Sequence, residues 1–382
     1  MIFSIFIWFI LLVFSCIIIW RSAKDFEVAS DFLGRKFTLG VKGATINAIA
    51  SSMPEFLSSL FFLFLLRDFR GFSATLGITA GSAIFNLLII PGLVILVVRL
   101  KQPRESILVS RRVLLRDGLF YVFAILVLLF IVDRNIKLWH GALLVGVYLV
   151  YLLYLFISIR KNKYFESSEE FHGIKDSVIH DRFMQHLVRL NIKEIIIGNK
   201  DLNRINAWIL LVVSTTVMAV GTLLLVYATE SISTELDVPI IFIALILAAA
   251  ASSVPDTVIS IRDARKGNYD DAISNALGSN IFDISFAIGL PLLLYTLFYK
   301  QIIATDDLNL EISLDLWVIL LFTSIIALVI FLLGRKMKTW KSITCIAIYV
   351  IFLLFILGQA VENSFLMTIS HYIFEVVEKI KP

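Results

Sequence analysis

Long apolar runs separated by short charged segments dominate this chain. Ten of the runs are long enough to cross a lipid bilayer as helices, since a span needs about 20 mainly apolar residues. The predicted spans cover residues 2–20, 41–66, 72–98, 114–132, 138–159, 207–227, 240–261, 272–295, 314–333 and 343–357. The pattern therefore predicts an all-α integral membrane protein with ten transmembrane helices.

The composition agrees with this prediction and narrows it. Of the 382 residues, 59% are hydrophobic and 17% are charged, against about 45–50% and about 25% in soluble domains.

The first run has no basic residues before it and no small-residue cleavage site after it, which favours a retained span over a signal peptide. Cys16 and Cys345 both fall in apolar runs, so we expect free thiols and no disulfide.

The basic residues gather on one side of the predicted membrane. All but seven of the 34 lysines and arginines fall in or beside the loops after the odd-numbered spans. By the positive-inside rule these loops are cytoplasmic and both termini lie outside, in a plasma membrane or a bacterial inner membrane. This topology explains the net charge of +4, so we expect no nucleic-acid partner. The seven exceptions are Arg67, Arg70, Arg134, Lys137, Lys300, Lys379 and Lys381.

One long polar segment, residues 161–205, divides the spans five and five. Its apolar residues Phe183, Leu187 and Leu190 have helical spacing, which predicts an amphipathic helix on the cytoplasmic membrane surface. With an odd number of spans in each half, residues 1–160 and 206–382 must be inserted in opposite orientations. We therefore predict two inverted five-helix repeats joined by a cytoplasmic loop.

Two motifs recur in the same order in both halves. Ala-Ser-Ser-Met-Pro-Glu at 50–55 in the second span matches Ala-Ser-Ser-Val-Pro-Asp at 251–256 in the seventh. In the span after each, Gly-Ser-Ala-Ile-Phe-Asn at 81–86 matches Gly-Ser-Asn-Ile-Phe-Asp at 278–283. Either motif alone would be weak evidence. Two motifs of similar chemistry, repeated in the same order in halves of opposite orientation, strongly indicate an internal repeat.

Three carboxylates belong to these motifs, and a carboxylate at the bilayer centre costs about 2.5–3.5 kcal/mol. Glu55, Asp256 and Asp283 are the only acids that the pattern puts near mid-span, whereas Asp133 and Asp315 are expected at span ends within reach of water. No lysine or arginine is expected mid-span to neutralise them. Mobile cations are therefore the natural candidates to compensate the negative charge of these three carboxylates. Protonated acids that hold helices together by hydrogen bonds are the alternative, but they do not explain the duplication.

The neighbours of the acids supply further oxygen atoms. Pro54 and Pro255 lack an N–H, so they break each helix and free carbonyls near Ala50 and Ala251. An all-oxygen ligand set suits hard cations such as Ca²⁺, whereas Zn²⁺ or copper would want histidine or cysteine. Such broken helices at the midplane of an inverted repeat are a transporter pattern. The side-chain donors are the hydroxyls of Ser51, Ser52, Ser252 and Ser253, and two pairs that share a helix face, Ser82 with Asn86 and Ser279 with Asp283.

The motif regions 48–92 and 249–291 resemble the two alpha repeats of the sodium/calcium exchanger superfamily. The resemblance implies a ten-helix fold with cations bound between spans 2, 3, 7 and 8, and a pair formed by spans 1 and 6 that slides past the rest. It implies that Glu55 and Asp256 are the central acidic ligands, binding Ca²⁺ and bridging the calcium and sodium sites. The other implied ligands are Asn86, Asp283, Ser52, Ser253, Ser82 and Ser279, with the backbones of Ala48, Ser51, Ala249 and Ser252.

Some positions depart from the family pattern. Ala50 and Ala251 stand where glycine is usual, and Ile78 replaces an asparagine that the second repeat keeps at Asn275. Asp283, in place of asparagine, is similar to the potassium-dependent branch.

The resemblance implies a secondary antiporter, and not an enzyme, that exchanges Ca²⁺ for Na⁺ by alternating access, with a K⁺ dependence left open. It implies that the protein has no cofactor and that its partners are inorganic cations and the lipid bilayer. The oligomeric state is left open. One alternative is a proton-coupled Ca²⁺/Mg²⁺ exchanger on the same fold. A remote one is an intramembrane aspartyl protease with Asp256 and Asp283 as its dyad, but the Gly-x-Gly-Asp signature is missing.

Overall fold

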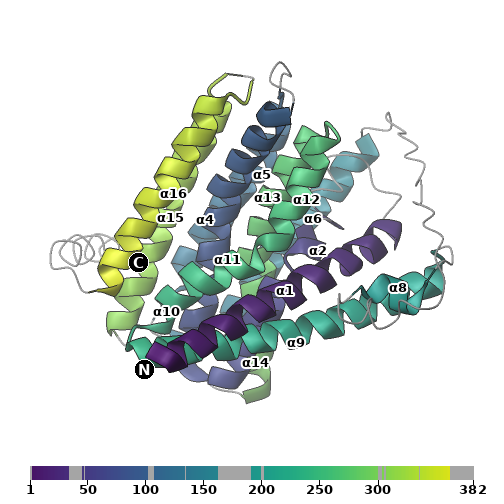
Figure 1. Ribbon diagram of the computed structural model, residues 1–382. Helices are drawn as coiled ribbons and strands as arrows, with labels where there is room; N and C mark the ends of the chain where they lie inside the picture. Colours follow the sequence, from purple (N-terminus) through teal and green to yellow (C-terminus); the bar gives the residue numbers. More distant parts are fainter. Residues whose placement is uncertain are drawn as a thin grey trace.

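The computed structural model describes most of the chain as a bundle of helices (Figure 1). Within the described residues, regular non-helical structure is confined to a two-residue antiparallel pairing of β1 (Asn135–Ile136) with β2 (Ile303–Ala304) and a single bridge between Leu108 and Lys336. The described residues are 2–33, 45–46, 48–101, 107–133, 135–161, 191–198, 202–299, 303–304, 307–334 and 336–361.

The elements fall into two successive sets. The first comprises α1 (Ile2–Leu33), α2 (Ala48–Ser51), α3 (Met53–Phe61), the π-helical turn η2 (Phe62–Leu66), α4 (Asp68–Lys101), α5 (Arg111–Ile131) and α6 (Leu138–Lys161). After the short α8 (Ile192–Ile196), the second comprises α9 (Arg204–Leu236), α10 (Ile240–Ile243), η3 (Ala244–Ala248), α11 (Ala249–Ser252), α12 (Val254–Arg265), α13 (Tyr269–Phe282), η4 (Asp283–Ala287), α14 (Ile288–Tyr299), α15 (Asp307–Leu332) and α16 (Thr339–Ala360).

The predicted membrane spans match these helices. Eight helices are each long and apolar enough to cross a bilayer, and Ile240–Ser252 with Val254–Arg265 pass the same test together as a pair bent by 40°. The apolar helix Met53–Leu66 stands at the second predicted span, of which residues 41–44 and 47 lie outside the described part. The all-α, multi-pass membrane fold is therefore confirmed. The predicted number of ten transmembrane helices is not confirmed, because the described residues contain eight or nine.

Several helices are longer than the apolar runs predicted. α1, α4 and α9 have 32, 34 and 33 residues, and about 20 are enough to span a bilayer. In Figure 1, α1 and α9 run side by side and cross α4, α15 and α16 at a steep angle. Their close approach requires Gly221 of α9, because a Cβ there would lie 2.9 Å from the Ile18 side chain of α1.

The structure corrects the expectation that Asp315 lies at a span end within reach of water. Asp315 is fully buried, two turns inside α15, because this helix starts seven residues earlier than predicted. Asp117 is also fully buried near the start of α5, where it accepts hydrogen bonds from Arg116, Tyr151 and Ser274. Asp133 is exposed beyond the end of α5, as predicted.

The end of the long polar segment is tied to the first and sixth spans. The Asp25 carboxylate on α1 accepts hydrogen bonds from the backbone N–H groups of Ile192 and Lys193 at 2.8 and 3.3 Å. Ile192 and Ile197 also pack against Leu210 of α9. The predicted amphipathic helix around Phe183 falls outside the described residues.

Candidate cation-binding site

Two matching breaks in the helices create the site. Pro54 and Pro255 stand in the first turn of α3 and α12, where proline is tolerated because that turn has no intrahelical use for its N–H. The residue at each break leaves helical geometry in the same way: Ser52 has φ −90° and ψ 5°, and Ser253 has φ −81° and ψ 3°. The repeat predicted from sequence is therefore also a repeat of local backbone conformation.

The carboxylates from both repeats converge on the hydroxyl of Ser82, on α4. Ser82 Oγ lies 3.3 Å from Glu55 Oε1 and 3.2 Å from Asp283 Oδ2, and it accepts from Ser253 Oγ at 3.0 Å. All four residues have 0% exposed surface. A hydroxyl has one proton to donate, so it cannot donate a full hydrogen bond to both carboxylates at once.

The third acid, Asp256, is better supplied with donors. Asp256 Oδ1 accepts from Ser279 Oγ at 2.6 Å, and Asp256 Oδ2 accepts from Asn86 Nδ2 at 2.9 Å. Asn86 Nδ2 also lies 3.4 Å from Ser82 Oγ, which links the two groups of acids. Asn275 fixes the backbone here by donating to the Asp256 carbonyl at 3.4 Å.

The two repeats are therefore unequal where they meet. In one, the neutral amide of Asn86 donates a hydrogen bond to Asp256; at the matching place in the other, Asp283 presents a second carboxylate beside Glu55. Two like charges in a dry, low-dielectric site repel strongly. None of the three acids forms an ion pair with a described lysine or arginine. The Glu55–Asp283 side is the part of the site with the greatest need for a cation.

Close packing of α4 on the broken seventh span holds Ser82 in place. A Cβ on Gly81 would lie 2.1 Å from the Leu245 carbonyl oxygen, and one on Gly77 would lie 2.4 Å from that of Ile241. Only glycine permits this backbone contact. On another side of α4, Asn280 Nδ2 of α13 donates to the Ala83 carbonyl at 2.9 Å.

Apart from Ser52, the remaining predicted ligands lie in the same region but already have partners. Ser51 Oγ lies 3.3 Å from Ser279 Oγ, and Ser252 Oγ donates to the Ala249 carbonyl at 3.1 Å. The Ala48 and Ala249 carbonyls each accept two hydrogen bonds, one from a hydroxyl and one from a backbone N–H. A cation bound by either carbonyl would therefore have to displace a hydroxyl.

The carbonyl freed by Pro255, that of Ala251, contacts a side chain of α1. The Cys16 thiol of α1 lies 3.7 Å from the Ala251 oxygen, a distance suited to a weak sulfur hydrogen bond. Both cysteines are free, as predicted; Cys345 is buried, but Cys16 is only half-buried.

Several buried oxygens of the site have no hydrogen-bond partner among the described residues. They are Ser52 Oγ, Glu55 Oε2, Asn86 Oδ1 and Asp283 Oδ1. Leaving such groups unsatisfied costs about 1–3 kcal/mol each, so they point to an absent ligand. Carboxylate, amide and hydroxyl oxygens fit Ca²⁺ and Na⁺ and do not fit a soft metal.

Sequence reasoning did not single out two buried residues, Asn280 and Tyr148, that each have a polar oxygen without a hydrogen-bond partner among the described residues. Asn280 stands inside the Gly-Ser-Asn-Ile-Phe-Asp motif, which was a signal for it, whereas Tyr148 of α6 stands in an apolar run that gave none. The π-helical turn η4 begins at Asp283 itself. Such turns are rare and often mark functional sites.

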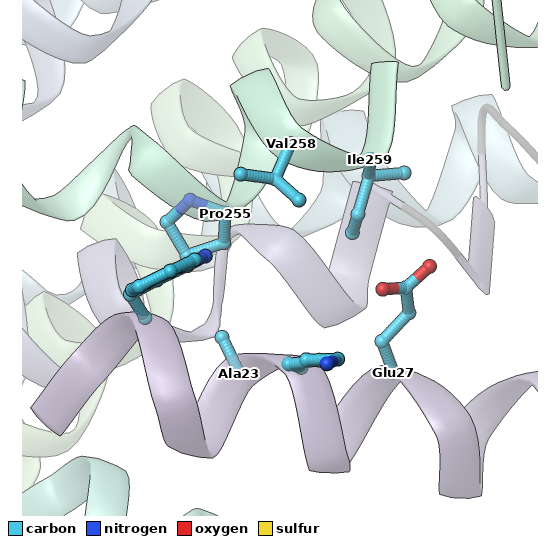
Figure 2. A pocket seen from close by; sticks show the side chains of 7 residues that line it. Ala23, Glu27, Pro255, Val258 and Ile259 are labelled. Atoms are coloured by element: carbon cyan, nitrogen blue, oxygen red, sulfur yellow. The ribbon is translucent and has the colours of Figure 1, made fainter. Parts of the chain in front are cut away.

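A pocket between α1 and α12 starts beside the site. Figure 2 shows Pro255, Val258 and Ile259 of α12 facing Ala23 and Glu27 of α1. Pro255 adjoins Asp256. Further along, Glu27 is buried and forms an ion pair with Arg262 of α12.

The protease alternative finds no support in this geometry. A catalytic dyad needs two carboxyl groups that share a proton. Here the oxygens of Asp256 bond to Ser279 and Asn86, and Asp283 bonds to Ser82.

Known relatives agree with the arrangement. The chain is 26% identical to the "Sodium/potassium/calcium exchanger 5" of Homo sapiens, over 85% of this chain and 76% of the relative. It is 31% identical to the "Sodium/potassium/calcium exchanger 3" of Homo sapiens, but over only 37% of this chain and 22% of that relative. The chain thus matches most of the first relative and less than a quarter of the second.

Solved structures share the fold. The crystal structure of the H⁺/Ca²⁺ exchanger CAX matches 99% of this chain and 88% of its own, with a TM-score of 0.66 and 15% identity. The sodium-calcium exchanger NCX_Mj, soaked with 10 mM Na⁺ and zero Ca²⁺, matches 92% and 98%, with a TM-score of 0.52 and 20% identity. The family described as "Sodium/calcium exchanger protein" matches residues 6–157 and 206–358. Since these segments take in both repeats and all three acids, the chain belongs to the sodium/calcium exchanger protein family.

Proposed function

We propose that this protein is a secondary antiporter that exchanges Ca²⁺ for Na⁺, with a further monovalent ion accompanying Ca²⁺. One observation carries the proposal: Glu55, Asp256 and Asp283, drawn from both repeats, are fully buried around Ser82 and Asn86 without a basic partner among the described residues. The names of the relatives, which pair Ca²⁺ with Na⁺ and K⁺, support the same ions.

The charge balance of the site explains why Ca²⁺ would be exchanged for Na⁺. Three ionised carboxylates give the site a charge near −3, which three Na⁺ would neutralise. One Ca²⁺ leaves about one negative charge for K⁺ or H⁺. An empty site would have to cross in its most charged form, which is costly in a low-dielectric medium. Because both loads compete for the same carboxylates, the carrier exchanges ions and does not leak them.

The proposed movement involves α1 and α9, the paired helices that cross the others steeply in Figure 1. They slide against the helices that hold the acids, exposing the site to one side at a time. We infer that ions reach the site along the interface of α1 and α12, where a small pocket is lined by Glu27 and by Pro255, the residue before Asp256 (Figure 2). By the distribution of basic residues the Glu27 end of this interface is cytoplasmic.

The same proposal includes the division of the chain into segments and its orientation in the membrane. Residues 1–160 and 206–382 form the two repeats, 161–205 the cytoplasmic loop, and both termini lie outside a plasma membrane or a bacterial inner membrane. The protein needs no cofactor, because the transported ions are its substrates.

Proton coupling is the second candidate. The observation that favours it is that the Ser82 hydroxyl, which has one proton to donate, lies within reach of both Glu55 and Asp283, because a proton could take the place of the accompanying monovalent ion. The same fold in the H⁺/Ca²⁺ exchanger CAX is compatible with both candidates.

Flux in proteoliposomes separates the candidates. Purified protein is reconstituted, and uptake of radiolabelled Ca²⁺ is measured under outward Na⁺, K⁺ or H⁺ gradients. The proposal expects uptake driven by Na⁺. Uptake driven by a proton gradient alone would replace it with the second candidate, and absence of uptake under all gradients would refute calcium antiport.

A further inference from the structure

An ion pair joins a helix of the proposed moving pair to a helix that carries one acid of the site. Glu27 of α1 pairs with Arg262 of α12, and the first turn of α12 also carries Asp256. The Glu27 side chain is 5% exposed, whereas the Arg262 side chain is 38% exposed. The pair therefore stands where the buried interface of α1 and α12 meets the surface.

The interface between this ion pair and the site is closed by buried side chains. The pocket of Figure 2 is lined by Glu27 and, nearer the site, by Pro255, the residue before Asp256. Ala23 of α1 and Ile259 of α12 face each other across it, and each is 3% exposed. An ion that takes this path has to separate the two helices, which breaks the ion pair.

Both charged groups have a second partner close by on their own helix. Arg262 Nη2 lies 3.8 Å from Asp263 Oδ1. Lys24 precedes Glu27 by three residues, a spacing at which side chains of a helix are neighbours, and it lines the same pocket. Separation of the helices therefore leaves neither charge alone. A buried pair without such substitutes would resist separation, because an uncompensated charge in a low-dielectric interface is costly.

The other buried ion pair described in the fold is arranged differently. Arg116 and Asp117 are neighbours in α5, and their side chains are 10% and 0% exposed. Asp117 also accepts hydrogen bonds from Tyr151 of α6 and Ser274 of α13. These contacts join helices outside the proposed moving pair, so this ion pair stabilises the fold and is not broken by the movement.

We propose that the Glu27–Arg262 ion pair is an ionic latch, which keeps the interface of α1 and α12 closed and opens when Arg262 exchanges Glu27 for Asp263. The inference rests on the movement of α1 and α9 in the proposed function. It gives the two acids beside Arg262 opposite effects, because Glu27 favours the closed interface and Asp263 favours the open one. An ion pair that only stabilises the fold has no such opposition.

The test measures how fast a thiol buried in the interface reacts. In a parent chain that carries Cys16→Ala and Cys345→Ala, Ile259→Cys supplies the thiol. The purified protein is treated in detergent with a charged thiol reagent, which reaches both faces. Glu27→Gln should raise the reaction rate about tenfold, which corresponds to about 1.4 kcal/mol in the equilibrium between closed and open interface. Asp263→Asn should lower the rate below that of the parent.

Two further variants separate the latch from a loss of packing. Glu27→Arg combined with Arg262→Glu restores the pair with its charges exchanged and should return the rate to that of the parent or below. Asp117→Asn should lower the melting temperature and leave the rate unchanged. The latch is wrong if Glu27→Gln reacts no faster than the parent, or if Asp263→Asn or Asp117→Asn reacts faster.

The thiol measurement is independent of ion flux, which keeps this inference distinct from the proposed function. A parent that moves no Ca²⁺ under any gradient would refute calcium antiport, whatever the order of the reaction rates. A parent that transports Ca²⁺, with equal reaction rates in all variants, would refute the latch and leave calcium antiport in place.

Discussion

Asp283→Asn removes the one acid that has no counterpart in the other repeat, where Asn86 stands. Asp283 Oδ2 and Glu55 Oε1 lie 3.2 and 3.3 Å from the same hydroxyl. A carboxylate and a monovalent cation about 6 Å apart attract each other by about 3 kcal/mol at an effective dielectric constant of 20. Removing the charge of Asp283 therefore lowers the affinity for the accompanying cation by about two orders of magnitude. The variant should still bind Ca²⁺ through Glu55 and Asp256.

The assay is sodium-driven calcium flux in proteoliposomes at varied K⁺ concentration and pH. The variant should lose whichever dependence the parent shows. Asp315→Asn is the matched control, because Asp315 is as deeply buried but shares no hydrogen bond with the site. K⁺ and pH profiles of Asp283→Asn that overlay those of a responsive parent would refute the reasoning and make Asp283 an ordinary calcium or sodium ligand.

Three other predictions follow from the site and the topology. Glu55→Gln and Asp256→Asn should each lower calcium uptake by at least about 100-fold while the protein still inserts, because neutral amides do not balance a divalent ion in a low-dielectric site; near-normal uptake by either would contradict the assignment. Gly81→Ala should lower both melting temperature and uptake, because the new Cβ overlaps the Leu245 carbonyl and destabilisation by overpacking is typically about 1–3 kcal/mol; an unchanged melting curve would count against this packing. Lys200→Cys should react with an impermeant thiol reagent only from the cytoplasmic side, and labelling only from outside would invert the topology.

Sequence reasoning located the spans and the centre of the site because both have a strong physical signal. A long apolar run has few alternatives to a membrane helix, and a mid-span acid next to a proline is costly unless it has a use. The repetition of Glu55 and its surroundings at Asp256 made the two breaks predictable. The structure brings the predicted side chains together around Ser82.

Features set by tertiary packing were not predictable in this way. Asp315 was expected near water, because an apolar run does not show that a polar segment before it continues the helix into the bundle. Tyr148 resembles any other aromatic residue of an apolar run until α6 packs on η4 and α14. Likewise, the occupied carbonyls of Ala48 and Ala249 depend on the rotamers of neighbouring serines, which spacing along the chain does not specify.

The central claim is that the buried carboxylates around Ser82 carry Ca²⁺ in exchange for Na⁺. Its most direct test is the initial rate of radiolabelled Ca²⁺ uptake into proteoliposomes loaded with Na⁺, for the parent and Glu55→Gln side by side. The account predicts uptake by the parent that collapses when the Na⁺ gradient is abolished, and uptake by the variant at the level of protein-free liposomes. Equal uptake by parent and variant, or uptake indifferent to every cation gradient, would contradict it.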